Sequence, residues 1–331
     1  MFVVQILVAN IAVPLGLYLA LTAAWLVGQR NRSPLGDSPE AASAVNDGDL
    51  GWRVAYAVLF GSSLYLAFAL RGTWWPSWDE FWQRIPIAAG GIALAGILPL
   101  RAGGRGGSAA LWAVRLAVVV GAGYLVFPSG PGWEFLASTR VPWLGAMALA
   151  AVVPWIVLSM VNRTVAGHLL LASLPAWAAA GFLTSQSFMK VTEPMLAVAT
   201  LSGSAGLTLL CLRRVPPLAA GLGALHFVGA AAIAQAQFNS YLGLPDGCSW
   251  FAMLLPAGLA AMAALGCCMA GRWGQAATPG HGSVGREAGC HPRSEPTNKW
   301  LLIVIWLTSL AASAGLVWYV HASVEQMGGA V

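Results

Sequence analysis

The chain has 331 residues, of which 58% are hydrophobic and only 9% are charged, whereas a soluble domain carries about 25% charged residues. So few charged side chains cannot cover a water-facing surface, which excludes a soluble globular protein, and the high hydrophobicity excludes a disordered chain. The formal net charge of +5 comes from arginines scattered between apolar runs, without a basic stretch that could follow phosphates, so we expect no nucleic-acid partner. The remaining class is an all-α integral membrane protein, with the lipid bilayer as its first partner.

A helix needs about 20 predominantly apolar residues to cross about 30 Å of hydrocarbon. Apolar runs of this kind, separated by polar breaks, recur along the chain, and each is apolar around its whole circumference. The third run is short, and Pro86 at its start suits a first helical turn. We predict a bundle of about ten transmembrane helices joined mostly by short loops, with spans at 1–27, 54–70, 85–100, 111–127, 141–160, 164–183, 194–212, 215–238, 250–271 and 300–320.

The basic residues give this bundle an orientation. The odd-numbered loops and the adjoining span ends hold 13 of the 17 Lys and Arg residues, the even-numbered loops hold 4, and the two terminal segments hold none. Because positively charged residues stay on the cytoplasmic side, the odd loops are predicted to be cytoplasmic. Both termini are then expected on the non-cytoplasmic side.

Two of the predicted cytoplasmic segments are long, at residues 28–53 and 272–299. Both are rich in Gly, Ser and Pro, show neither helical nor strand periodicity, and are predicted to be flexible linkers. Neither is large enough for a separate catalytic domain, and the chain has no GxxxxGKS/T, GxGxxG or HExxH motif. His281, Cys290 and His291 are metal-binding residue types in the second linker, but a structural zinc site needs four ligands. We therefore predict a single membrane domain, 1–331, with no metal site and no cofactor.

Tryptophans and carboxylates recur together in the two outward loops at 72–84 and 128–140. In the first loop, Ser77 and Glu80 have the spacing of a capping box, which predicts a short helix in the headgroup region. Indole faces and carboxylates can hold a cation or bind a sugar, so a duplicated hairpin of this kind would present a ligand site. An aromatic belt is the interpretation we favour, because Trp concentrates at membrane interfaces in any case. The residues of the alternative, a ligand site, are Trp78, Asp79, Glu80, Trp133 and Glu134.

Polar residues are scarce inside the spans, and no Asp or Glu lies well inside any of them. Carriers driven by protons or sodium usually need a carboxylate at depth, so this composition disfavours an ion-coupled transporter. His226 is the deepest ionisable group, and Gln237 lies on nearly the same helix face, whereas Gln235 points away. This stripe would line a pathway or bind a headgroup; the interpretation we favour is a neutral histidine bonded to a neighbouring helix.

Two further patterns concern packing. In the span 194–212, Thr200, Ser204 and Thr208 are spaced by four and share a face, and Ser202 and Gly206 also lie four residues apart. Small residues at this spacing let helices approach closely, and hydroxyls can bond across the interface. Arg115 lies one turn inside its span and is expected to extend its side chain back to the cytoplasmic surface.

Without a nucleophile–base pair or a metal-ligand set, no catalytic residue is assigned and an enzyme is disfavoured. The leading hypothesis is a non-enzymatic membrane component (complex subunit, assembly factor or receptor-like protein) that acts through helix packing, outer loops and other membrane subunits. The first alternative is a permease or channel for a neutral or lipid-like molecule along the stripe of His226 and Gln237. The second is a membrane-embedded transferase acting on a lipid-linked substrate, with Asp79, Glu80 and Glu134 as its candidates. The preference for Arg over Lys and the richness in Ala, Gly and Trp suggest a bacterial cytoplasmic membrane.

Overall fold

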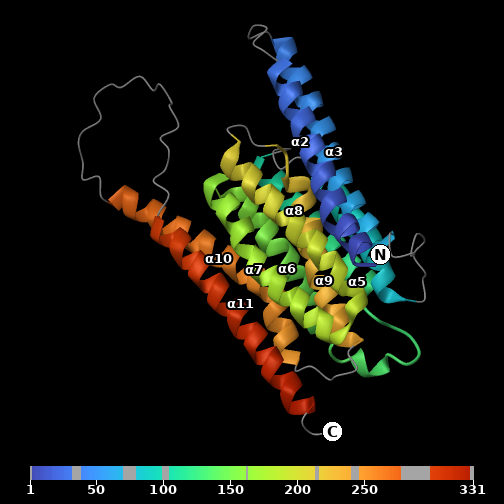
Figure 1. The fold of residues 1–331 in the computed structure, drawn as a ribbon. Helices are drawn as coiled ribbons and strands as arrows, with labels where there is room; N and C mark the ends of the chain where they lie inside the picture. Colours follow the sequence, from blue (N-terminus) through green and yellow to red (C-terminus); the bar gives the residue numbers. More distant parts are fainter. Residues whose placement is uncertain are drawn as a thin grey trace.

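The computed structural model describes residues 2–31, 39–69, 80–98, 104–161, 163–212, 216–239, 246–276 and 299–328. Within these ranges the chain is all-helical and has no strand, which confirms that the protein is all-α. The helices form one bundle, with the long α10 and α11 along one flank (Figure 1).

Within the described ranges, eight helical segments are long and apolar enough to cross a membrane. The first runs through α1 (Phe2–Leu7), a π-helical turn (Val8–Ala12) and α2 (Val13–Asn31). The other seven belong to α3 (Pro39–Ala69), α5 (Gly104–Val126), α6 (Arg140–Met160), α7 (Arg163–Ser187), α8 (Thr192–Cys211), α10 (Asp246–Ala276) and α11 (Lys299–Gly328).

Two further helices occupy the remaining predicted spans but fall outside this set. The helix α4 (Ile85–Ile97) has 13 residues, fewer than a bilayer requires, and Pro86 lies in its first turn as predicted. The helix α9 (Ala219–Phe238) has 20 residues, but His226, Gln235 and Gln237 lower its hydropathy. Each predicted span therefore coincides with a helix, and the multi-pass membrane architecture rests on the eight long ones.

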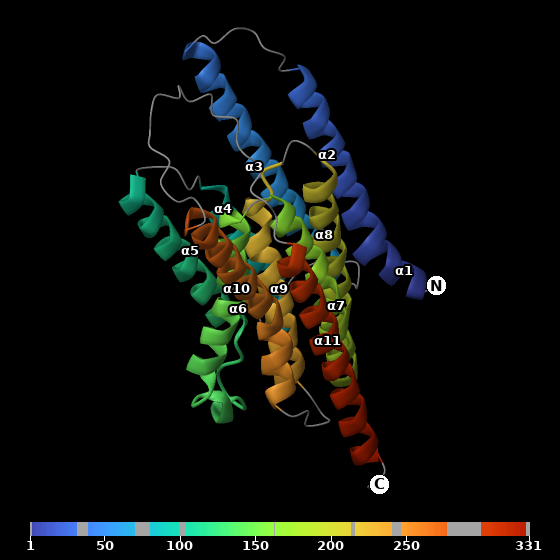
Figure 2. The ribbon, with the colours of Figure 1, turned by 90° about the vertical axis from the view of Figure 1, so that its left-hand side faces the viewer.

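The segment 28–53, predicted as a linker, is largely helical, and this corrects the prediction. Helix α2 continues to Asn31 and α3 already begins at Pro39, ahead of the predicted span start at residue 54. The two helices lie side by side and extend beyond the ends of the other helices (Figures 1 and 2). Polar residues limit the part of a helix that can lie in the hydrocarbon layer, but the helix itself can continue past them. In the second predicted linker, α10 reaches Ala276 and α11 begins at Lys299, and residues 277–298 lie outside the described ranges.

Helix α9 is the centre of the bundle. It packs against α3, α4, α6, α7, α8 and α10, and every residue from 220 to 236 whose side chain is described is buried. Three of its glycines lie directly beneath aromatic rings, Gly221 under Phe60 of α3, Gly223 under Trp155 of α6 and Gly229 under Trp177 of α7. A Cβ atom at any of these glycines would overlap the ring. Because aromatic rings fill the space along α9, its surroundings are tightly packed.

The contact between α7 and α8 confirms the packing predicted for Ser202 and Gly206, whereas Thr200 and Ser204 donate to carbonyls of their own helix. Gly206 faces Gly167 of α7, and a Cβ on either glycine would lie 3.0 Å from the carbonyl oxygen of the other. Ser202 Oγ lies 3.0 Å from Ser173 Oγ and donates to the carbonyl of Leu170 at 3.1 Å. Small residues therefore let the two backbones approach closely, and hydroxyls bond across the interface.

Candidate functional site

The carboxylate of Glu80 is the centre of a polar and aromatic cluster at one end of the bundle. Its Oε2 accepts hydrogen bonds from Trp82 Nε1 at 2.5 Å and from Gln83 Nε2 at 3.0 Å. Lys190, in the short turn Met189–Val191 between α7 and α8, places its Nζ 3.8 Å from the same oxygen. The ammonium also lies 5.4 Å from the ring centre of Trp82 and 5.9 Å from that of Phe188. The loop before α4 thus holds a cation that belongs to another loop of the same chain.

The aromatic part of this cluster is fixed by packing. Trp82 is buried, stacks on Phe68 at the end of α3, and meets the ring of Phe188 edge to face. Glu80 and Lys190 remain half exposed. The cluster therefore joins a rigid indole to a hydrated ion pair, an arrangement suited to binding an organic cation or to clasping two loops together.

The capping box predicted for Ser77 and Glu80 is corrected in part. Glu80 has extended backbone angles (φ −108°, ψ 112°), and the helical turn Phe81–Arg84 begins only after it. Its carboxylate accepts hydrogen bonds from the side chains of Trp82 and Gln83. Ser77, Trp78 and Asp79 lie outside the described residues.

The loop before α6 contacts the loop before α4 through aromatic rings. Trp133 meets Phe81 edge to face, with ring centres 6.2 Å apart, and stacks on Phe135. Glu134 accepts a hydrogen bond from the amide of Gly132 at 2.9 Å, in a turn where Gly132 has a φ of +86° that favours glycine. The structure therefore brings the two hairpins together through Trp133, while Glu80 and Glu134 keep separate partners.

The histidine in the centre of the bundle is packed, as the favoured interpretation expected, but its bond is of a different kind. His226 is 2% exposed, and its Nδ1 lies 2.9 Å from the carbonyl oxygen of Leu222 one turn earlier in α9. The imidazole lies against the ring of Trp177, with centres 5.8 Å apart. We predicted a bond from His226 to a neighbouring helix, but its Nδ1 bonds to a carbonyl of α9 itself.

The glutamines further along α9 also differ from the predicted stripe. Gln235, expected to point away, is 1% exposed and donates to the carbonyl of Val126 at 2.7 Å, at the end of α5. Gln237 is half buried, and its side-chain oxygen accepts a hydrogen bond from Ser249 of α10 at 2.6 Å. The spacing of residues along a helix shows which of them share a face, but it does not show which faces are buried. In α9 the face with Gln237 and the face with Gln235 are both covered by neighbouring helices. The two glutamines tie α9 to its neighbours.

Arg115 is the largest departure from the sequence-based expectation. Its guanidinium does not extend to the surface, because the residue is only 2% exposed. It donates to three carbonyls at the end of α4, those of Ala95 at 3.3 Å, Gly96 at 3.4 Å and Leu98 at 2.8 Å. The rings of Trp112 and Trp155 flank it, each 4.7 Å from the guanidinium carbon. Since the last carbonyls of a helix lack intrahelical donors and carry partial negative charge, Arg115 caps the short helix α4.

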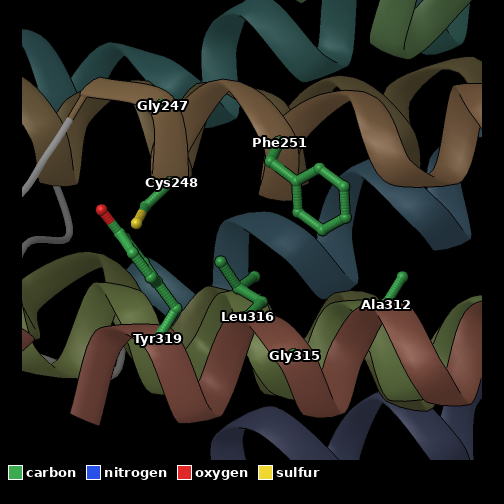
Figure 3. A pocket seen from close by; sticks show the side chains of 7 residues that line it. All are labelled: Gly247, Cys248, Phe251, Ala312, Gly315, Leu316 and Tyr319. Atoms are coloured by element: carbon green, nitrogen blue, oxygen red, sulfur yellow. The ribbon is translucent and has the colours of Figure 1, made fainter. Parts of the chain in front are cut away.

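Two grooves border α11, and the sequence analysis identified neither. The first, of about 350 Å³, lies between the start of α10 and the second half of α11 (Figure 3). At one end the thiol of Cys248 and the hydroxyl of Tyr319 point toward each other, and the remaining lining is apolar (Figure 3). The second, of about 800 Å³, lies between α7 and α11. One feature of the sequence could have indicated a polar face on α11. Four of the five positions spaced by four from 309 to 325 are polar, namely Ser309, Ser313, His321 and Glu325, and the fifth is Val317.

No group of three or more His, Cys, Asp or Glu side chains in the described part of the chain could hold a metal ion. Comparison with protein-family models, with curated proteins and with solved structures finds no match to this chain.

Proposed function

We propose that the chain is a non-enzymatic component of a membrane assembly, a subunit, assembly factor or receptor-like protein. In this proposal ten helices cross the bacterial cytoplasmic membrane, and both termini lie on the non-cytoplasmic side. The eight long apolar helices support the multi-pass part, and the distribution of Lys and Arg supports the orientation.

The observation that carries the proposal is the packing around α9. Phe60, Trp155 and Trp177 fill the space beside its glycines, and His226 is bonded and stacked. A permease would need His226 and Gln237 to face a hydrated path, whereas here each has a protein partner. This favours a structural or binding role over the permease or channel.

The outer carboxylates weigh against the transferase in the same way. Glu80 is bonded to Trp82 and Gln83 and paired with Lys190, and Glu134 accepts a bond from its own loop. A general acid or base has to reach the proton that it transfers. Both side chains instead hold the loops in place, which suits a surface that partners recognise.

The contact surface for other subunits is expected on the outer helices. Among the eight long spans, those of α11, α2 and α5 are the least buried within the chain. Their exposed apolar side chains, among them Leu307 on α11 and Leu116 on α5, face lipid or a neighbouring subunit.

Native mass spectrometry of the tagged protein, extracted in mild detergent from its own membrane, tests the proposal. A complex of defined mass, in which the 34.4 kDa chain is joined by a second protein at fixed stoichiometry, is the expected result. The same complex should form with the His226→Ala variant. A lone chain, together with uptake of a small molecule that is lost in His226→Ala, would overturn the proposal in favour of a permease.

A further inference from the structure

The larger groove is built from one small-residue face of α7 and one face of α11. It is lined by residues of α7 from Pro175 to Phe182 and residues of α11 from Leu310 to His321. The small side chains of Ala178, Ala179 and Ala314 leave the space open, and Phe182 and Trp318 add aromatic walls. Its volume of about 800 Å³ lies within the usual range of small-molecule sites, about 300–1,000 Å³.

One hydroxyl in this groove lacks a partner. Ser313 is 6% exposed and lines the groove, and its Oγ has no hydrogen-bond partner among the described residues. Several other described helix hydroxyls donate to a carbonyl of the preceding turn, as Ser323 does to Tyr319 on the same helix. One turn before Ser313, Ser309 donates to the carbonyl of Ala172 and so anchors α11 to α7. A buried hydroxyl without an acceptor costs free energy, so Ser313 calls for an acceptor inside the groove.

The depth of the groove in the membrane follows from the tryptophans of α11. Trp300 and Trp318 are both exposed, and at 1.5 Å per residue they lie about 27 Å apart along the helix, close to the thickness of the hydrocarbon layer, about 30 Å. Tryptophans concentrate at the two boundaries of that layer. Ser313 then lies about 8 Å inside the boundary at Trp318, so a lipid whose ester oxygen reaches it lies about 8 Å deeper in the groove than the lipids of the surrounding layer. His321 and Glu325 form a pair at 3.2 Å beyond that boundary, at headgroup level.

We propose that this groove binds a membrane phospholipid, with one hydrocarbon chain between α7 and α11 and an ester carbonyl accepting a hydrogen bond from Ser313. The apolar lining matches the chain, and the open side of the groove gives access from the bilayer. The ester oxygen is the acceptor that a lipid carries next to its hydrocarbon. The exposed pair of His321 and Glu325 at the mouth meets the polar headgroup. The proposal concerns the groove between α7 and α11 and does not depend on a protein partner.

The test uses the full chain in lipid nanodiscs that contain phosphatidylglycerol with a photoactivatable diazirine in one acyl chain. After illumination, adducts are mapped by peptide mass spectrometry. We expect them on the peptides of α7 and α11 that contain Pro175–Phe182 and Leu310–His321. Ser313→Ala should lower the adduct yield about fivefold, the loss of one hydrogen bond worth about 1 kcal/mol. Ser323→Ala, which removes a hydroxyl outside the groove, should leave the yield unchanged.

A second pair of variants distinguishes loss of lipid from the groove from loss of the folded protein. Ala314→Trp fills the groove from an exposed position, whereas Ala311→Trp adds the same side chain at an exposed position of α11 that lines neither groove. Both should keep the thermal midpoint of the wild type, and only Ala314→Trp should abolish labelling of the groove peptides. Equal labelling of the groove peptides in Ala314→Trp and Ala311→Trp would overturn the proposal. Adducts spread evenly over the exposed faces of α11 would overturn it as well.

Discussion

The ammonium of Lys190 lies over the indole of Trp82, 5.4 Å from the ring centre, and 3.8 Å from the carboxylate of Glu80. A tryptophan and a carboxylate in the loop before α4 are the groups that would bind a cationic ligand. Here the chain supplies the cation itself. The cluster therefore works as a clasp between the loop before α4 and the turn before α8.

Removing the cation should weaken the clasp and leave its site empty. Lys190→Ala is expected to lower the free energy of unfolding by about 0.2–1 kcal/mol, because the ion pair is half exposed. Methylammonium at tens of millimolar should then recover part of the lost thermal midpoint, since it fills the space over Trp82. The midpoint in detergent is the readout, and the double variant Glu80→Gln/Lys190→Ala is the control. Equal recovery in the double variant would show that the carboxylate plays no part.

The packing of α9 predicts a marked difference between two glycines. Gly229→Ala places a Cβ into the ring of Trp177, whereas Gly258→Ala in α10 has nothing within 4 Å of the added atom. Overpacking should destabilise the first variant by about 1–3 kcal/mol. The second should be neutral or more stable by up to about 1 kcal/mol, because alanine favours the helix. Thermal unfolding of both variants in one detergent decides the matter, and a neutral Gly229→Ala would contradict tight packing at this helix.

Arg115 is predicted to be essential for the end of α4. Arg115→Met leaves the carbonyls of Ala95, Gly96 and Leu98 without their donor. We expect the free energy of unfolding to fall by about 3 kcal/mol or more. Arg163→Ala is the control, because this exposed arginine donates to one helix-end carbonyl, that of Leu212. Its loss should cost less than about 1 kcal/mol. The prediction fails if the two variants unfold at the same temperature.

The orientation is tested by single cysteines in a cysteine-free background. Val45→Cys and Gly285→Cys fall in the two segments predicted to be cytoplasmic, so a membrane-impermeant thiol reagent should label them only after the membrane is opened. Ser129→Cys, exposed in the loop before α6, should react in intact cells. Labelling of either of the first two from outside would contradict the proposed orientation.

The helices were predictable because their signal is local. An apolar run long enough to span a bilayer identifies a helix without any knowledge of its neighbours, and Pro86 marks the start of α4 as expected. The start of α3 at Pro39 is not predictable in this way, because the polar residues 39–53 precede the apolar run although they belong to the same helix.

The site residues depend on tertiary contacts that a single sequence does not reveal. Arg115 was expected at the surface, since the carbonyls that it caps belong to another helix, brought beside it only by folding. The helix wheel assigned Gln237 to the functional face and set Gln235 aside, yet Gln235 is the more deeply buried and reaches the end of α5. In the same way, nothing local indicated that Lys190 would meet Glu80.

The central claim is that α9 is sealed by protein and lines no water-filled path. Cysteine scanning of the face that carries His226 tests it most directly, with the five native cysteines replaced and His226→Cys, Ala230→Cys and Ile233→Cys introduced singly. A small water-soluble thiol reagent should leave all three unlabelled in the native membrane while it labels Ser129→Cys fully. Labelling of the three α9 positions, blocked by an added small solute, would contradict the claim and identify a pathway through the bundle.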